Sequence, residues 1–108
     1  MYIVTPDEMR TPIHRTLGSL LGPTRAAPGC LNARIYVDLD KPKNLLLVEE
    51  WESREQFESS LDSEKLNALV AAMELSCEAP VVRVDLIERE EGVEALARHR
   101  GVTGGAAR

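Results

Sequence analysis

The sequence predicts an α+β domain whose elements follow the order strand, helix, strand, strand, helix pair, strand. Two observations support this prediction: apolar and polar residues alternate between residues 31 and 39, and apolar residues recur at helical spacing in residues 13–21 and 66–77. At 108 residues the chain is long enough for one domain with a modest core. We expect that domain to span residues 1–90 and to be followed by a tail over 91–108.

The first strand is predicted over residues 2–4, and Pro6 ends it because proline lacks the N–H that a strand needs. We expect Thr11 to cap a helix with Pro12 in its first turn, where no backbone N–H is required. The Gly22-Pro23 pair is predicted to end this helix. Its apolar stripe contains Ile13, Leu17, Leu20 and Leu21.

A hairpin is predicted next, because two strand-like segments flank the turn residues 40–44. The second segment is apolar on both sides over residues 45–48 and leads to Trp51, which indicates that both faces of the sheet are at least partly covered. In the first segment, the residues expected to share the covered face are Leu31, Ala33, Ile35, Val37 and Leu39.

Two helices and a last strand are predicted after the hairpin. Ser53 and Gln56 form a capping-box pattern, and Asp62-Ser63 restarts the helix. The residues expected on the buried face of the second helix are Leu66, Leu69, Val70, Met73 and Cys77. Residues 82–86 alternate as a strand, residues 92–100 suggest a short helix, and the remaining tail is expected to be disordered.

This order of elements is the βαββαβ plan of the ferredoxin-like kind, with a four-stranded antiparallel sheet. Helices on one face would leave the other face bare, and that face would carry Tyr36, Val81 and either Leu46 or Leu47. Burial against a second copy covers such a face, so we expect a sheet-to-sheet homodimer.

Composition excludes several classes of partner. The net charge is -5 and the isoelectric point is near 5.0, which disfavours nucleic acid and anionic membranes. We see no signal peptide and no apolar run long enough to span a bilayer, so we expect a soluble, cytoplasmic protein. Cys30 and Cys77 show no pairing or metal-ligand spacing and are expected to be reduced.

Two segments, residues 24–31 and 47–55, resemble the antibiotic biosynthesis monooxygenase (ABM) family of dimeric ferredoxin-like α/β barrels. The resemblance covers roughly residues 2–88. Members of that family include cofactor-independent quinol and polyketide oxygenases, so the resemblance implies a monooxygenase that uses no cofactor and acts on a small reduced aromatic, such as a quinol or a polyketide phenol. It also implies that Trp51 lines a substrate pocket, although core packing explains a tryptophan there equally well.

The chain departs from the family pattern at Ser60, because many members have a histidine nine residues after the tryptophan. An imidazole transfers protons near neutral pH, and a lone serine hydroxyl does not. Heme-degrading relatives also use an asparagine on the first strand, which residues 2–4 lack, so we reject heme degradation. The first strand is short for the middle of such a sheet, and we expect the true translation start to lie upstream of Met1.

Three residues are candidates for catalysis, each with a simpler explanation. Trp51 would form a pocket wall, Ser60 would direct a hydroxyl into the pocket or lie at its solvent edge, and His14 would replace the missing imidazole or lie at a helix edge on the surface. We expect the apolar lining of the pocket to come from Leu17, Leu21, Phe57, Leu61 and Met73.

No cofactor or metal is expected, because the sequence has no phosphate-binding glycine loop or dinucleotide fingerprint. Glu49 and Glu50 are adjacent in a strand and therefore point to opposite faces, so they cannot chelate a metal together. Two alternatives to an enzyme are a non-catalytic dimeric protein that keeps the pocket and binds a small aromatic, and a purely structural interaction protein. The enzyme and the binding protein both require room beside Trp51.

Overall fold

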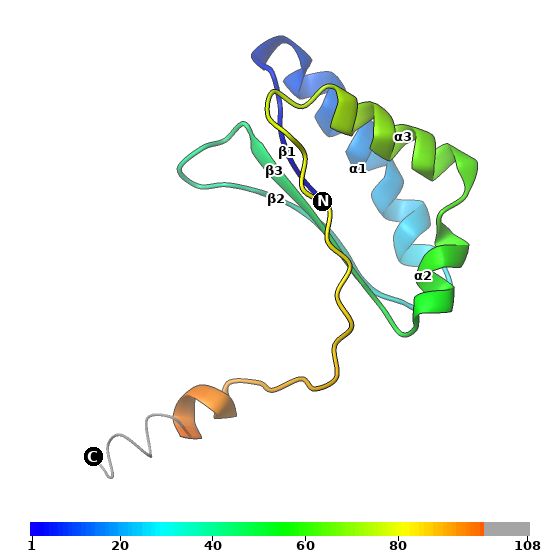
Figure 1. The fold of residues 1–108 in the computed structure, drawn as a ribbon, viewed down its shortest axis with the longest axis vertical. Coiled ribbons are helices and arrows are strands. Elements are labelled where there is room, and N and C mark those ends of the chain that lie inside the picture. Colours follow the sequence, from blue (N-terminus) through cyan, green and yellow to red (C-terminus); the bar gives the residue numbers. More distant parts are fainter. Residues whose placement is uncertain (99–108) are drawn as a thin grey trace.

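The computed structural model describes residues 1–98. An antiparallel sheet in the order β1-β3-β2 is covered by helices on one face only, as Figure 1 shows. This is the ferredoxin-like α+β arrangement. The elements along the chain are β1 (Tyr2–Val4), the 3-10 turn η1 (Asp7–Met9), α1 (Arg10–Ala26), β2 (Cys30–Val37), β3 (Asn44–Trp51), α2 (Arg54–Ser60) and α3 (Ser63–Glu74).

The core lies between the sheet and the two longer helices. β3 is the central strand, and it pairs Leu45 with Ile3 of β1 and Leu47 with Ile35 of β2. Because side chains alternate along a strand, Leu45 and Leu47 both point toward the helices. The residues that form the buried cluster are Ile3, Ile13, Leu17, Leu45 and Ala72.

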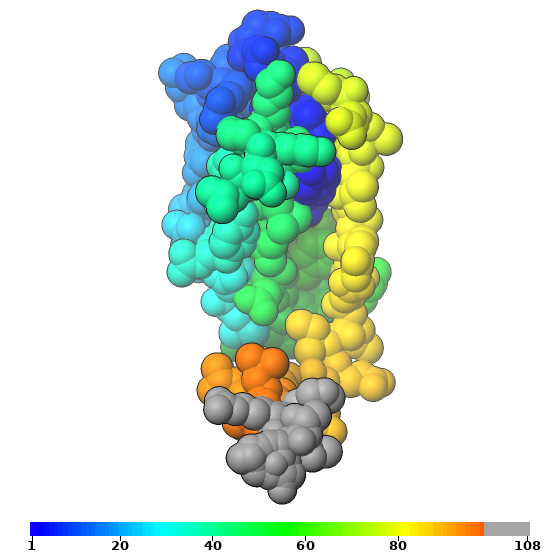
Figure 2. Space-filling view, turned by 90° about the vertical axis from the view of Figure 1, so that its left-hand side faces the viewer, coloured from blue at the N-terminus to red at the C-terminus, as the bar shows by residue number. Residues whose placement is uncertain are grey.

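The predicted fourth strand forms one bridge only. Val81 pairs with Tyr2 through two backbone hydrogen bonds of 2.8 and 3.0 Å. Residues 82–88 then run on without regular structure, and Figure 2 shows this yellow segment along one side of the molecule. The sheet described here therefore has three strands, and the fourth strand stays a prediction.

The first helix differs from the prediction at both ends. It begins at Arg10 after η1, so Thr11 is not its cap, although Pro12 still lies in the first turn. Pro23 lies inside the helix, which continues to Ala26, and the predicted stop at Gly22-Pro23 is therefore wrong. The last turn of the helix contacts β2, where the Arg25 Nε–H donates to the Ala33 carbonyl at 2.9 Å.

The hairpin forms as predicted, with a shorter first strand. β2 ends at Val37, because the Asp38 carboxylate accepts hydrogen bonds from the backbone N–H groups of Asp40 and Lys41 and turns the chain. Leu39 is consequently 95% exposed and does not extend the strand. Of the five residues expected on the covered face, Ala33 is buried and Ile35 is partly buried against the core.

Both helix starts after the hairpin are confirmed. The Ser53 hydroxyl accepts from the Gln56 N–H at 3.2 Å, and the Asp62 carboxylate accepts from the Lys65 N–H at 2.9 Å. The predicted buried face of α3 is correct only in part, since Leu69 and Met73 pack against the core. Leu66 and Val70 are each 42% exposed and Cys77 lies exposed beyond the helix end, whereas the buried residues of α3 are Lys65 and Ala72.

The packed face of α3 is therefore shifted toward Lys65, which is buried in an ion pair with Glu49. Further along the chain, residues 94–98 are helical, as predicted for part of the tail. The expected disorder after residue 100 and the placement of His99 lie outside the described residues.

Candidate functional site

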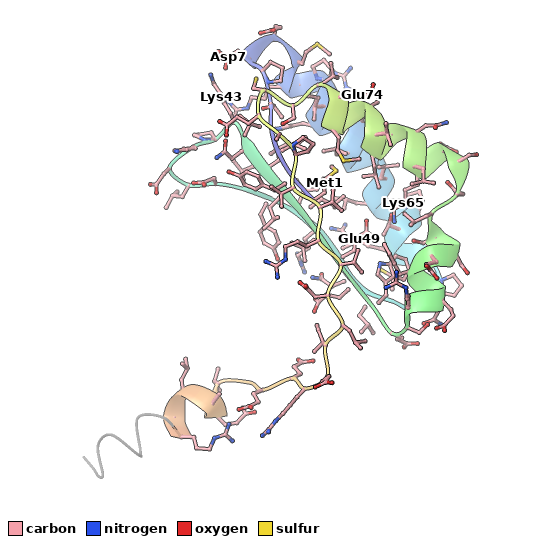
Figure 3. All side chains as sticks on the ribbon, in the orientation of Figure 1. Met1, Asp7, Lys43, Glu49, Lys65 and Glu74 are labelled. Carbon is pink, nitrogen blue, oxygen red and sulfur yellow. The ribbon has the colours of Figure 1, made fainter. Side chains whose placement is uncertain are left out.

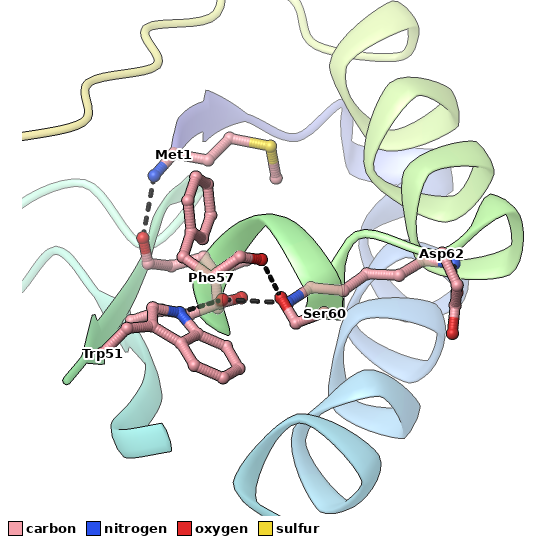
Figure 4. A network of polar contacts seen from close by, with 8 residues as sticks. Met1, Trp51, Phe57, Ser60 and Asp62 are labelled. Carbon is pink, nitrogen blue, oxygen red and sulfur yellow. Dashed lines mark hydrogen bonds and ion pairs between the residues drawn. The ribbon is translucent and has the colours of Figure 1, made fainter. Parts of the chain in front are cut away.

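A polar cluster lies between the end of β3 and the helices α2 and α3. The Lys65 ammonium is 2.9 Å from Glu49 Oε1 and 3.4 Å from the Ser60 hydroxyl oxygen. The Trp51 indole N–H donates to the same Glu49 oxygen at 3.1 Å. Figure 3 shows Glu49 and Lys65 pointing toward each other, and Figure 4 shows Trp51, Phe57 and Ser60 at this network.

Local sequence features bring these side chains together. Glu49 and Trp51 follow Leu45 and Leu47 at every second position of β3, so all four point toward the helices. Ser60 is the last residue of α2, whose start is fixed by the Ser53 cap. The Asp62 cap then starts α3 so that Lys65 lies in its first turn, facing the sheet.

The charges of this cluster are largely removed from water. The side chain of Lys65 is 7% exposed and that of Glu49 is 13% exposed. A buried charge is costly without a partner, so each of these two groups makes the burial of the other tolerable. The Lys65 nitrogen also lies 5.3 Å from the centre of the Trp51 ring, a favourable distance for a cation–π interaction.

The amino group of Met1 lies close to this cluster and donates a hydrogen bond to the Leu47 carbonyl at 2.8 Å. Burial lowers the pKa of this amino group below its usual value of 8.0, because the charged form loses water. The negative charge of Glu49 acts in the opposite direction and raises the pKa, but its effect is the smaller of the two.

Three of the predicted site residues meet here. The ring centroids of Trp51 and Phe57 are 6.4 Å apart and the ring planes are tilted by 53°, which is within the usual range for aromatic contacts. The Ser60 hydroxyl donates to the Phe57 carbonyl at 2.5 Å and accepts from Lys65. Its oxygen is therefore directed into the cluster.

His14 lies elsewhere. His14 is near the start of α1. The cluster lies at the end of β3, which pairs with the start of β2. The opposite end of α1 contacts β2, through Arg25. At 1.5 Å per residue, the 11 residues between His14 and Arg25 separate these positions by about 16 Å along the helix. The His14 Nε2 atom is buried and has no hydrogen-bond partner among the described residues. The structure does not join His14 to Trp51 or Ser60.

The expected apolar lining divides between the core and the cluster. Leu17 is part of the buried core, and Met73 packs against it. Phe57 contacts Trp51, and Leu21 and Leu61 are half-buried.

One pocket of about 110 Å³ lies between α1 and α3, away from Trp51. Its lining is almost entirely apolar and consists of Met9, Pro12, Ile13, Thr16, Ala71, Ala72 and Leu75, which includes none of the five expected residues.

Glu49 and Lys65 are the site residues that sequence reasoning missed. From the sequence, Glu49 was considered only as a possible metal ligand, and Lys65 was not considered at all. The signal is nevertheless present, because Glu49 continues the alternation of Leu45 and Leu47, and Lys65 is four residues before Leu69 and shares its helix face.

The site contains groups that can hold an anion and accept a proton. Within residues 1–98, no group of three or more His, Cys, Asp or Glu side chains is placed to bind a metal ion. Over the same residues, no helix combines the length and the apolar character that crossing a bilayer requires.

Comparisons with known proteins agree with the fold. Rv0793 from Mycobacterium tuberculosis is 25% identical, with a TM-score of 0.67 over 82% of this chain and 93% of that one. A solved antibiotic biosynthesis monooxygenase is 18% identical, with a TM-score of 0.68 over 80% and 93% of the two chains. PA3566 from Pseudomonas aeruginosa is 19% identical, with a TM-score of 0.62 over 78% and 89%.

A search of curated proteins found no match. The family model described as antibiotic biosynthesis monooxygenase matches residues 1–72, a range that includes both resembling segments and the whole polar cluster. With two thirds of its 108 residues matched, the chain belongs to the antibiotic biosynthesis monooxygenase family.

Proposed function

We propose that this protein is a cofactor-independent monooxygenase that acts on a reduced aromatic such as a quinol or a polyketide phenol. The observation that supports this most directly is the polar cluster of Glu49, Trp51, Ser60 and Lys65 at the end of β3. It combines an aromatic surface with charged groups that are shielded from water, which suits a reaction in which charge develops on an aromatic ring.

The reaction needs only the substrate and molecular oxygen. The substrate hydroxyl loses a proton, the resulting anion passes an electron to O₂, and the two radicals combine to form a carbon–oxygen bond. The peroxide then loses water from a carbon that still carries a hydrogen, which leaves a carbonyl group. One oxygen atom ends in the product and the other in water, and all the electrons come from the substrate.

The protein would contribute a surface that orients the ring and a dry environment. Trp51 and Phe57 are half-buried, so their partly exposed edges are where an aromatic substrate would make contact. The pocket between α1 and α3 does not reach this place. An aromatic substrate would therefore bind at these edges, outside that pocket.

The proposed assembly is a homodimer formed sheet to sheet. The face of the sheet opposite the helices exposes Tyr36 at 48% and Leu46 at 40%, two residues that are paired across β2 and β3. The segment after Val81 adds exposed apolar side chains beside it, namely Val82, Val84, Leu86 and Ile87. A second copy would cover these apolar groups, and it would also give residues 82–88 a surface on which to form the predicted strand.

A second candidate is a non-catalytic protein that binds a small apolar molecule. The pocket between α1 and α3 favours it, because that pocket is apolar and separate from the Trp51 cluster. A volume of about 110 Å³ is well below the several hundred Å³ of a typical ligand site, so this candidate ranks second.

Oxygen uptake tests the two candidates. The protein is incubated aerobically with a panel of hydroquinones and anthrones, and we expect turnover that Trp51→Ala reduces at least about 100-fold by removing the wall of the site. Leu39→Ala, in the exposed hairpin loop, is the control and should retain full activity. No uptake across the panel would contradict the enzyme, and ligand-induced thermal shifts without turnover would then support the binding protein.

A further inference from the structure

The ion pair of Lys65 and Glu49 does more than the fold requires. Replacing such a buried pair by apolar residues of similar size is often neutral or stabilising, so stability does not explain why charges are placed here. The neighbouring positions Leu45 and Leu47 show that β3 accommodates apolar side chains on this face. A carboxylate beside an ammonium, both largely shielded from water, can accept a proton and hold an anion.

The hydrogen bonds of Glu49 are distributed unevenly between its two oxygens. Oε1 accepts from the Lys65 ammonium and from the Trp51 indole N–H. Among the described residues, none donates to Oε2. A carboxylate held by one oxygen keeps lone pairs on the other, and the 13% of the side chain that is exposed leaves this group within reach of a bound molecule.

The geometry points to a substrate that carries an ionisable hydroxyl on its aromatic ring, with Glu49 as the proton acceptor and Lys65 as the group that holds the anion. This inference rests on the proposed function. The hydroxyl of a phenol or an enol would donate to Oε2, and its proton would pass to that oxygen. A substrate without an acidic hydroxyl, such as an alkyl ether of the same ring, would not react.

The role of Lys65 follows from the charges before and after this step. The free site pairs one ammonium with one carboxylate. After proton transfer the carboxyl group is neutral and the substrate carries the negative charge, so Lys65 still faces one anion and the net charge of the site is unchanged. A buried ammonium thereby removes the largest cost of forming an anion away from water.

The first test compares Glu49→Gln with Glu50→Gln, which changes an exposed carboxylate on the opposite face of the same strand. The amide introduced by Glu49→Gln keeps an oxygen for Lys65 and Trp51 but cannot take the proton. We expect kcat for hydroquinone oxygenation to fall at least about 100-fold with little change in KM, and Glu50→Gln to retain wild-type rates. Equal rates in the two variants would overturn the assignment of Glu49.

The second test needs no turnover. In the Glu49→Gln variant the Lys65 ammonium loses its own counterion, so nitrophenolate should bind at least about 10-fold more tightly than to the wild type. The yellow absorbance of the anion and the quenching of Trp51 fluorescence report binding. The double variant Glu49→Gln/Lys65→Met should lose this gain, and an equal affinity in all three proteins would overturn the assignment of Lys65.

The two tests separate this inference from the proposed function. If the wild type oxygenates quinols and Glu49→Gln does so equally well, the function stands and the proton acceptor is wrong. If no quinol is oxygenated but nitrophenolate binding follows the predicted order, the function is wrong and the anion site stands.

Discussion

Removing the ammonium of Lys65 should destabilise the protein more than the loss of an exposed charge does. Lys65→Met keeps most of the aliphatic stem, so the change deletes mainly the charge. It leaves Glu49 87% covered with one remaining hydrogen bond from Trp51, since the side chain is 13% exposed. Breaking a fully buried pair costs about 3–5 kcal/mol, and the residual exposure of Glu49 reduces this to about 2–3 kcal/mol.

The measurement is urea unfolding followed by the fluorescence of Trp51, the only tryptophan of the chain. A loss of that size lowers the melting temperature by roughly 10–20 °C for a domain of this length. Protein concentration must be the same in all samples, because the stability of a dimer depends on it.

Arg54→Met is the matched control. The pair of Arg54 and Glu58 is separated by 3.5 Å, but both side chains are more than half exposed, and such pairs contribute little. We therefore expect no measurable change in the control. If Lys65→Met lowers the free energy of unfolding no more than Arg54→Met does, the ion pair of Lys65 is solvated and the cluster is not shielded from water. A double variant with Glu49→Gln should recover part of the loss, because no unpaired charge is then buried.

Three further predictions follow from individual residues. Gly29→Ala should cost about 1–2 kcal/mol in urea unfolding, because Gly29 has a φ of +84° and a Cβ there would overlap the Gln56 side chain; an unchanged midpoint would contradict this. Asp62→Ala should cost about 1 kcal/mol by removing the cap of α3, with Asp40→Ala in the hairpin loop as a control that changes little. Leu46→Glu should convert the proposed dimer to monomers in light scattering, and an unchanged mass would argue against the sheet-to-sheet interface.

Much of the local structure was predictable because it depends on residues close together in the sequence. The alternation around Ile35 identifies a strand, and the turn residues after Asp38 identify the hairpin. The caps Ser53 and Asp62 each bond to an N–H three residues away, so they mark the starts of α2 and α3 without any knowledge of packing.

Features that depend on distant contacts could not be obtained in this way. Pro23 lies within a helix whose last turn is bonded to the following strand through Arg25. Val81 bridges to Tyr2, which is far from it in the sequence, and residues 82–88 form no regular strand.

The polar cluster shows the same division within a single site. Trp51 and Ser60 were predicted as site residues from the resemblance to the family, but Glu49 and Lys65, which carry the charges of the cluster, were not. Glu49 and Lys65 are 16 residues apart, and each carries a side chain that is usually solvated. The two charges come within 2.9 Å of each other only in the folded structure. They pair there because a charge shielded from water is costly without a partner of opposite sign.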